Sequence, residues 1–412
     1  MTANPMAQLP PLALVGLGVA VSLYVGKLAR RLGLPSLIGY LVTGVLMGAS
    51  IAGVIGESSL SSTRFVTDIA LGFVAFTIGS ELSAASLRQL GSAIVLIILF
   101  ESFMAFFVVF FAVYALTGGE TAVAMVFAAL APASAPAGTV AVIQEYRARG
   151  RLTKALYAVV GFDDGLAILI YGFAAAFARS LVSHNVQGLA ASMLLPAREI
   201  VLSAALGAVM GFAYTLLSRR LRTPTELPAL TFAFVAMTAG VAAHFHLSLI
   251  LACMSIGFVL SNSTPRTTVS RIVMQNRNLM PLVFILFFFL AGAHLDVSAI
   301  PALGAIGLVY ILARSSGKIL GAWLGAKIGR AEPNIRRYLG MGILSQAGVA
   351  IGLSLILAHD FARIGNPQAD RIASMVITTI AATSVVFEIV GPLLAKRALR
   401  LAGEIGKQGE GE

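Results

Sequence analysis

The chain has 412 residues, of which 58% are hydrophobic and only 11% are charged, and its mean hydropathy is +0.91. This composition excludes a soluble enzyme and predicts an integral membrane protein. The net charge of +11 does not indicate a nucleic-acid partner, because the basic residues lie in short loops between apolar segments. Cys253 is the single cysteine, which excludes a disulfide framework and a cysteine-based metal site.

Apolar segments recur along the whole chain, and we predict thirteen of them to be membrane-spanning helices. They occupy roughly residues 12–29, 35–50, 63–82, 91–117, 120–144, 154–178, 198–217, 228–244, 248–261, 279–293, 301–327, 337–358 and 371–395. The first segment is followed by Lys27, Arg30 and Arg31, which is the wrong polarity for a cleaved signal peptide. We therefore expect a single all-α membrane domain over residues 1–412, without a soluble domain.

Lysine and arginine are divided very unevenly between alternate loops of this topology. One side carries 22 of the 29 Lys and Arg residues and the other carries 5, while Arg314 and Lys318 lie within a span. The positive-inside rule places the richer side in the cytoplasm. We therefore expect a multi-pass protein of the inner cell membrane, with the N-terminus outside and the C-terminus in the cytoplasm.

The two halves of the chain resemble each other at an offset of 213 residues. The segment Phe76–Leu82 matches Phe289–Leu295, Gly44 matches Gly257, and Glu101 falls on Arg314. This pattern predicts a first repeat over residues 1–178, a linker helix at 198–217, a second repeat over 228–397 and a cytoplasmic tail at 398–412. The offset is an odd number of spans, so the six-helix repeats are inverted, as in many secondary transporters. Chance similarity of apolar segments is the alternative.

Two predicted spans contain residues that interrupt a membrane helix. Span 5 combines two prolines, a glycine and two hydroxyl residues between Pro132 and Thr139. Span 12 carries Ser345 and Gln346 among glycines, without a proline. Interrupted membrane helices free backbone groups, which are tolerated where they line a cavity. We expect discontinuous helices at both places, the alternative being a simple kink.

Asp163 and Asp164 lie side by side in the middle of span 6. Ionisable residues at this depth are costly and usually mark an ion or proton path. Adjacent residues of a helix point about 100° apart, so the two carboxylates are expected to have different roles. One can face a solvent cavity and take an ion, while the other pairs with a cation on a neighbouring helix.

Span 11 carries two cations, Arg314 and Lys318, on one helix face at an i, i+4 spacing. Buried cations require partners, and the carboxylates in apolar spans that can supply them are Asp163, Asp164, Glu101 and Glu388. Snorkelling of both cations to the cytoplasmic interface is the alternative. Glu388 is equally consistent with a second charge partner and with a residue facing a polar crevice.

A carboxyl group in a low-dielectric cavity can hold either a proton or a cation, because burial disfavours its bare charged form. Alternating exposure of such a site exchanges one species for the other. Hard oxygen ligands suit Na⁺ or Li⁺, and K⁺ is not excluded.

These motifs together resemble those of the cation/proton antiporter superfamily, most closely the bacterial Na⁺/H⁺ antiporters with paired aspartates. The matching segments are Gly161–Gly165 on span 6, Ser134–Thr139 on span 5 and Gly317–Gly321 on span 11. The resemblance covers almost the whole chain. It implies a homodimeric exchanger of protons for Na⁺ or Li⁺ that serves pH homeostasis and needs no cofactor. It also implies a mobile core of spans 4–6 and 11–13 and a dimerisation scaffold of spans 1–3 and 8–10.

The resemblance further implies roles for single residues. Asp164 would bind the Na⁺ ion, and Asp163 would form a salt bridge with Lys318 that breaks when the ion binds. Thr139 and Ser134, with the carbonyls of span 5, would line the site. The secondary candidates are Arg314, Glu388, Glu101 and Gln346. Relatives commonly carry an Arg-Gly-Glu triplet where this chain has Gln346, Ala347 and Gly348, which puts the role of span 12 and the cation in question.

Other functions fit the sequence less well. A K⁺/H⁺ antiporter of the same superfamily is the first alternative. An organic-anion symporter on a similar fold would need a basic or amide-rich substrate pocket. A channel would need a continuous polar pore lining, and a sensor would need a soluble output domain.

Overall fold

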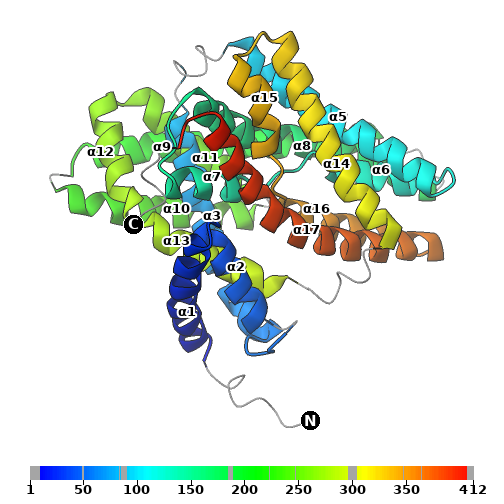
Figure 1. The fold of residues 1–412 in the computed structure, drawn as a ribbon, viewed down its shortest axis with the longest axis horizontal. Coiled ribbons are helices and arrows are strands. Elements are labelled where there is room, and N and C mark those ends of the chain that lie inside the picture. Colours follow the sequence, from blue (N-terminus) through cyan, green and yellow to red (C-terminus); the bar gives the residue numbers. More distant parts are fainter. Residues whose placement is uncertain are drawn as a thin grey trace.

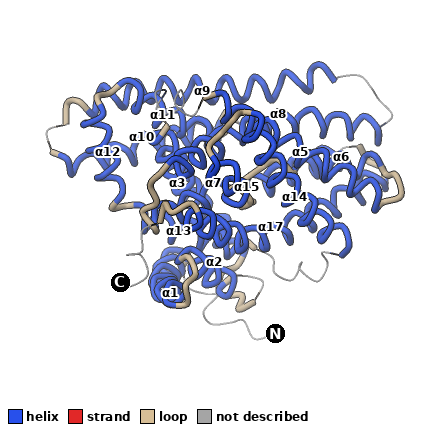
Figure 2. The backbone as a smooth tube through the Cα atoms, turned by 45° about the horizontal axis from the view of Figure 1, so that its top comes forward, coloured by secondary structure: helices blue, strands red, loops and turns tan. Residues whose placement is uncertain are grey.

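The computed structural model describes residues 10–48, 51–82, 84, 91–183, 189–221, 223–245, 247–295, 304–346, 348–362 and 364–405. Helices and loops make up all of these residues, which confirms the predicted all-α class (Figures 1 and 2). The helices are α1 (Pro11–Arg31), α2 (Ser36–Met47), α3 (Glu57–Glu81), α5 (Ser92–Leu116), α6 (Thr121–Leu130), α7 (Pro136–Glu145), α8 (Arg151–Ser183), α9 (Leu189–Ser218), α10 (Leu227–His244), α11 (Leu249–Ser263), α12 (Arg266–Arg277), α13 (Met280–His294), α14 (Gly304–Ile328), α15 (Pro333–Gly342), α16 (Gly348–Ala362) and α17 (Pro367–Leu401), with a short 3-10 helix η2 (Pro224–Glu226).

The protein is an integral membrane protein. Among the described residues, 7 helices are long and apolar enough to cross a membrane, or 8 if α12 and α13, bent by 52° at their junction, form one span. Each of the thirteen predicted spans overlaps one helix or one interrupted helix pair. The count of thirteen remains a prediction, because α2 and α11 are shorter than a full span. The predicted tail begins inside α17, and its residues 406–412 lie outside the described residues.

Helix α12 is a structural element that the search for apolar segments does not predict. It carries polar residues on most of its surface, while Ile272 is buried and Val269 packs against the main core. A helix of this kind is stabilised by one narrow apolar face and by its tertiary contacts, so a criterion based on long apolar runs misses it.

Helices α5 and α14 pack closely because glycines on α14 meet the backbone of α5. A Cβ atom at Gly321 would overlap the carbonyl oxygen of Phe100 and would lie 2.7 Å from the Cα of Glu101. Gly317, Gly325 and Gly329 face α5 in the same way. Small residues at a spacing of four allow such close approach of membrane helices. The contact brings Glu101 on α5 against the helix that carries Lys318.

Two further helix pairs, α2 with α13 and α3 with α11, also pack through glycines. In each case a Cβ atom added to the glycine would overlap a carbonyl oxygen of the opposite helix. The four contacts are Gly44 with Phe289, Gly257 with Phe76, Gly79 with Met254 and Gly292 with Leu41. Every residue in these contacts has its counterpart 213 positions away. The same type of glycine contact thus occurs at matched positions of the two halves of the chain.

Helices from different parts of the chain occupy different sides of the molecule. Figures 1 and 2 show α10, α11 and α12 on one side of the molecule and α5, α6 and α14 on the other. Helices α7, α8 and α15 lie between these groups (Figure 1). The apolar interior forms two large clusters, one around α3, α7, α8 and α11 and the other around α6, α14, α16 and α17.

Candidate functional site

The centre of the molecule contains two interrupted helices that face each other. Helix α6 ends at Leu130 and α7 begins at Pro136, where the fixed φ of proline suits the start of a helix. The second interruption separates α15, which ends at Gly342, from α16, which begins at Gly348. Both discontinuities predicted from the sequence are therefore present.

The two interruptions satisfy each other's backbone groups. The Ala135 amide donates to the Ser345 carbonyl at 2.8 Å, and the Ser134 hydroxyl donates to the Ile343 carbonyl at 3.4 Å. The Thr139 hydroxyl donates to the Gly342 carbonyl at 2.6 Å. Backbone groups freed at a helix end inside a membrane need such partners, so these bonds explain how both interruptions are tolerated.

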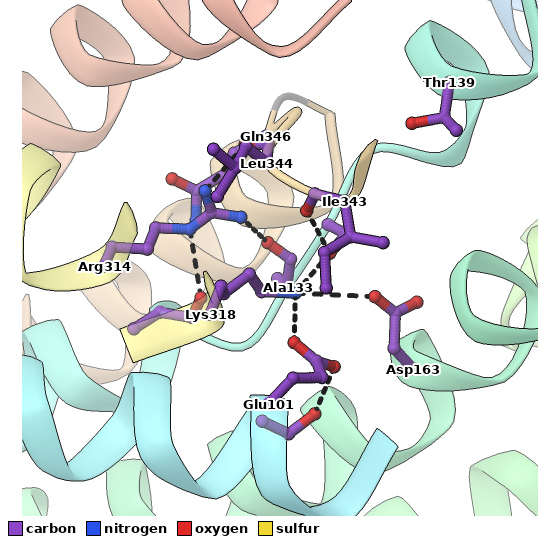
Figure 3. A network of polar contacts seen from close by, with 12 residues as sticks. Glu101, Ala133, Thr139, Asp163, Arg314, Lys318, Ile343, Leu344 and Gln346 are labelled. Atoms are coloured by element: carbon purple, nitrogen blue, oxygen red, sulfur yellow. Dashed lines mark hydrogen bonds and ion pairs between the residues drawn. The ribbon is translucent and has the colours of Figure 1, made fainter. Parts of the chain in front are cut away.

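Arg314 binds both interruptions at once. Its Nε donates to the Ala131 carbonyl at 3.0 Å, its Nη2 to the Ala133 carbonyl at 2.8 Å and its Nη1 to the Leu344 carbonyl at 2.8 Å (Figure 3). The guanidinium carbon also lies 4.4 Å from the ring centroid of Phe387. The expectation of a carboxylate partner for Arg314 is therefore wrong. The free carbonyls at the C-terminal ends of α6 and α15 carry partial negative charge, and they bind the guanidinium group in place of a carboxylate.

Gln346 completes the crossing of the two interruptions. Its amide nitrogen donates to the Leu130 carbonyl at 3.0 Å and lies 2.9 Å from the hydroxyl of Tyr310. The uncharged Gln346 side chain thus connects the end of α6 with Tyr310 on helix α14. Ala347, the middle residue of the triplet discussed above, lies outside the described residues.

Lys318 lies at the centre of a buried charge cluster. Its Nζ is 2.7 Å from Glu101 Oε2, 3.5 Å from Asp163 Oδ2 and 2.5 Å from Ser134 Oγ (Figure 3). The side chains of the two carboxylates and the lysine have no exposed surface. Glu101 also accepts a hydrogen bond from Ser102 Oγ at 2.8 Å. Sequence reasoning expected Asp163 to be the partner of Lys318, whereas Glu101 is the nearer carboxylate.

Asp164 differs from its neighbour in having no polar partner. Its residue is 1% exposed, and within the described part of the chain neither of its carboxylate oxygens accepts a hydrogen bond. Among the described residues, Asp163 forms an ion pair with Lys318, and neither of its carboxylate oxygens accepts a hydrogen bond. The two carboxylates thus have different surroundings, which is consistent with their offset of about 100° on the helix. A buried carboxyl without a partner is stable only when it holds a proton or a cation.

Two other candidate residues lie apart from this cluster. Figure 3 shows Thr139 away from the contacts of Lys318, and its hydroxyl is engaged with Gly342. Glu388 on α17 is buried, and among the described residues it forms no ion pair with Lys318 or Arg314. The structure therefore does not bring Thr139 or Glu388 to the lysine.

Sequence reasoning singled out Ser345 in the predicted break of span 12, but it missed Ser102 and Tyr310, which contact Glu101 and Gln346. Ser345 is buried between Gly138 and Gly391, and its hydroxyl has no hydrogen-bond partner among the described residues. Serine hydroxyls in apolar helices usually bond to the backbone of their own helix, so a serine in the sequence does not by itself indicate a site. The contacts of Ser102 and Tyr310 are visible only in three dimensions.

A family model described as "Sodium/hydrogen exchanger, transmembrane" matches residues 17–397. The Na⁺/H⁺ antiporter NhaH of Halobacillus dabanensis is 23% identical over 362 residues, covering 84% of this chain and 88% of that protein. The NhaH of Halobacillus aidingensis is 22% identical over 364 residues, covering 83% and 88%.

Solved structures of the sodium proton antiporter MjNhaP1 from Methanocaldococcus jannaschii share the fold. One, determined at pH 8, has a TM-score of 0.68 and 16% identity and covers 98% of this chain and 99% of that chain. The other, from electron microscopy, has a TM-score of 0.74 and 17% identity and covers 96% and 98%.

Proposed function

Because this chain belongs to the sodium/hydrogen exchanger family, we propose that it exchanges protons for Na⁺ across a cell membrane through alternating access of Asp164. The family assignment confirms the resemblance to cation/proton antiporters seen in the sequence. The observation that carries the proposal is the buried Asp164 carboxylate, which has no polar partner among the described residues. Such a group binds one proton or one monovalent cation, so the two species compete.

Asp163 and Lys318 adjust the charge beside this site. Glu101 and Ser134 hold the ammonium group at 2.7 and 2.5 Å, so Lys318 stays in place when Asp163 moves or takes up a proton. Asp163, at 3.5 Å, is the more loosely held of the two carboxylates. It can therefore turn toward a cation on Asp164 without leaving Lys318 unpaired, which would be costly in a buried position.

The interrupted helices supply further oxygen ligands near the carboxylates. Ser134 lies in the first interruption and contacts Lys318 directly. Arg314 ties the two interruptions together through carbonyl groups of both, which makes their relative position less variable. Carboxylate, hydroxyl and carbonyl oxygens suit Na⁺ and also Li⁺, with K⁺ as the alternative cation. Thr139 would join these ligands only after its bond to Gly342 breaks.

Transport further requires that the site reach both sides of the membrane. We propose a mobile core of α5–α8 and α14–α17 and a dimerisation scaffold of α1–α3 and α10–α13, with α9 as the linker. The matched glycine contacts at the offset of 213 residues support two inverted repeats. In transporters with inverted repeats, one repeat or bundle moves against the other and opens the site to each side in turn.

The charge cluster does not favour an organic-anion symporter. Such a transporter needs cations that are free to bind the substrate. Here Arg314 is occupied by three carbonyl groups and Lys318 by two carboxylates and a hydroxyl. Neither side chain has exposed surface that an anion could reach.

Proton movement in proteoliposomes tests the proposal. We expect Na⁺ to drive proton exchange in the native protein and Asp164→Asn to reduce it to the level of empty liposomes, because the amide cannot be ionised. Glu120→Gln is the matched control, since it makes the same change in an exposed ion pair with Arg371 and should keep exchange. Exchange close to the native rate in Asp164→Asn would refute the assignment. Li⁺ and K⁺ assayed in the same way identify the cation.

A further inference from the structure

The short turn between α1 and α2 is held by two charged side chains from other parts of the chain. Both carboxylate oxygens of Glu145 accept the Ser36 amide, at 3.0 and 2.9 Å, and Oε1 also accepts the Ser36 hydroxyl at 2.8 Å. Lys396 Nζ donates to the Gly33 carbonyl at 2.7 Å and lies 4.7 Å from the ring centroid of Tyr146. Gly33 has a φ of 77°, which a residue with a side chain rarely adopts.

The signs of the two charges match the helix ends that they contact. Glu145 lies at the N-terminus of α2, where Pro35 provides no side-chain cap, so the carboxylate satisfies an otherwise free amide. Lys396 binds a carbonyl just beyond the C-terminus of α1. A negative group at a helix N-terminus and a positive group at a helix C-terminus are both stabilising. Hydrogen bonds that involve a charged group are also among the stronger ones.

The two charged side chains and the turn belong to different parts of the proposed transporter. Glu145 is the last residue of α7 and Lys396 lies near the end of α17, and both helices belong to the proposed core. The turn joins α1 and α2 of the proposed scaffold. The positive-inside rule places this turn, with Lys27, Arg30 and Arg31, on the cytoplasmic side.

A cavity of about 430 Å³ adjoins this contact, and Ser36, Glu145, Arg30, Arg147 and Arg277 are among its lining residues. Its lining comes from α1, α2, α7, α12 and α13, so it lies between the proposed core and scaffold. Because polar and charged side chains are among the lining residues, Glu145 can be hydrated when it leaves Ser36. Separation of the contact therefore does not leave a bare charge in an apolar environment.

We propose that Glu145 and Lys396 form a clasp on the α1–α2 turn that closes the cytoplasmic side of the transporter. The proposal rests on the proposed function, because it requires the core to move against the scaffold. The clasp must open each time the ion site faces the cytoplasm. Its strength therefore sets the fraction of molecules that are open inward, and with it the apparent cation affinity on each side.

Glu404 provides a matched control for this contact. Its carboxylate accepts the amides of Leu152 and Thr153, both at 2.7 Å, and the Thr153 hydroxyl at 2.6 Å. It thus caps the N-terminus of α8 much as Glu145 caps that of α2. Glu404 follows α17, however, so this contact joins two parts of the core. Glu404→Gln removes a comparable interaction without affecting the core–scaffold boundary.

The accessibility of a cysteine at Ala141 tests the clasp without relying on transport. Ala141 lies one turn before Glu145, lines the same cavity and is 2% exposed. Ala141→Cys would be made with Cys253→Ala and labelled with a membrane-impermeant maleimide in inside-out vesicles. We expect Glu145→Gln and Lys396→Met to raise the labelling rate about tenfold, the scale of a hydrogen bond to a charged group. Glu404→Gln should leave it unchanged. An equal rate in all variants, or an equal rise in Glu404→Gln, would overturn the clasp.

Transport measured from both sides provides the second readout. In Glu145→Gln the apparent KM for Na⁺ should fall on the cytoplasmic side and rise on the outer side. A larger population of the inward-open state makes the site more available from the cytoplasm and less available from outside. A rise on both sides would indicate a damaged site and would overturn the clasp. If the native protein showed no exchange, the proposed function would fail, while the labelling experiment would still decide whether the clasp exists.

Discussion

Lys318 shows how a single residue can connect several parts of the candidate site. Its ammonium group contacts α5 through Glu101, α8 through Asp163 and the first interruption through Ser134. Glu101 is the closer carboxylate and is itself oriented by Ser102. The lysine is therefore held more closely by α5 than by α8, and in the proposed transport cycle its contact with α8 is the one that changes.

This arrangement predicts unequal coupling of Lys318 to its two carboxylates. Breaking a buried pair leaves an uncompensated charge and costs roughly 3–5 kcal/mol. We expect Glu101→Gln and Lys318→Gln to be strongly coupled, so that the double variant loses less stability than the sum of the single losses. A double-mutant cycle of Asp163→Asn with Lys318→Gln should give a smaller coupling energy. Asp163 lies 3.5 Å from the Lys318 ammonium group, whereas Glu101 lies 2.7 Å from it.

Thermal unfolding in detergent measures both cycles. A larger coupling for Asp163 than for Glu101 would contradict the geometry and would restore the simpler aspartate–lysine pair. Transport by Asp163→Asn adds information that stability does not contain. If Asp163 only adjusts the charge beside Asp164, this variant should retain exchange with a changed response to membrane potential.

At the scale of helices, glycines decide which elements can approach each other. The α14 glycines place Glu101 within reach of Lys318, because a side chain at Gly321 would separate the two backbones. The α2–α13 and α3–α11 pairs use glycines at matched positions of the two proposed repeats. The same local packing is thus used twice, in two segments of different sequence.

The matched contacts predict matched effects of substitution. Gly79→Ala and Gly292→Ala each place a methyl group against a carbonyl oxygen of the opposite helix, so each should cost about 1–3 kcal/mol of stability. Gly240 in α10 has no atom within 4 Å of an added Cβ and serves as the control. Gly240→Ala should be neutral or stabilising by up to about 1 kcal/mol. Melting temperatures of the three variants in detergent measure these effects. A lower melting temperature in only one of Gly79→Ala and Gly292→Ala would argue against equivalent repeats.

At the scale of the whole molecule, two exposed ion pairs join the proposed repeats at matched places. Arg151 at the start of α8 pairs with Glu332, which precedes α15. Arg371 near the start of α17 pairs with Glu120, which precedes α6. The predicted topology puts the first pair in the cytoplasm and the second outside. Exposed ion pairs contribute little to the free energy of unfolding. These two pairs are informative because they occur at corresponding places of the two proposed repeats.

The orientation of the molecule can be tested by labelling intact cells. We expect a cysteine at Arg149, in the loop between α7 and α8, to react only with a membrane-permeant reagent, because the charge bias places this loop in the cytoplasm. A cysteine at Phe245, which is 64% exposed, should react with an impermeant reagent from outside. Both variants require Cys253→Ala. Labelling of position 149 from outside would reverse the predicted orientation.

The sequence by itself determined the features of this protein that depend on local composition. Long apolar segments predicted the membrane helices, and the prolines of span 5 predicted an interruption that the structure has between Leu130 and Pro136. The adjacent Asp163 and Asp164 marked the candidate site, because carboxylates inside an apolar membrane helix are costly and usually serve an ion or proton path. The charge bias and the repeat offset are also sequence properties, although the orientation and the inverted repeats remain predictions.

The tertiary structure alone decided the partners of the buried charges. Arg314 is satisfied by carbonyls of two interruptions that lie far apart in the sequence, and a search for opposite charges does not consider such groups. Lys318 lies closer to Glu101 than to Asp163 because glycines bring α14 against α5, a contact that only the packed structure reveals. The partner of a buried charge is the polar atom that packing brings within about 3 Å of it, and no local sequence pattern encodes that distance.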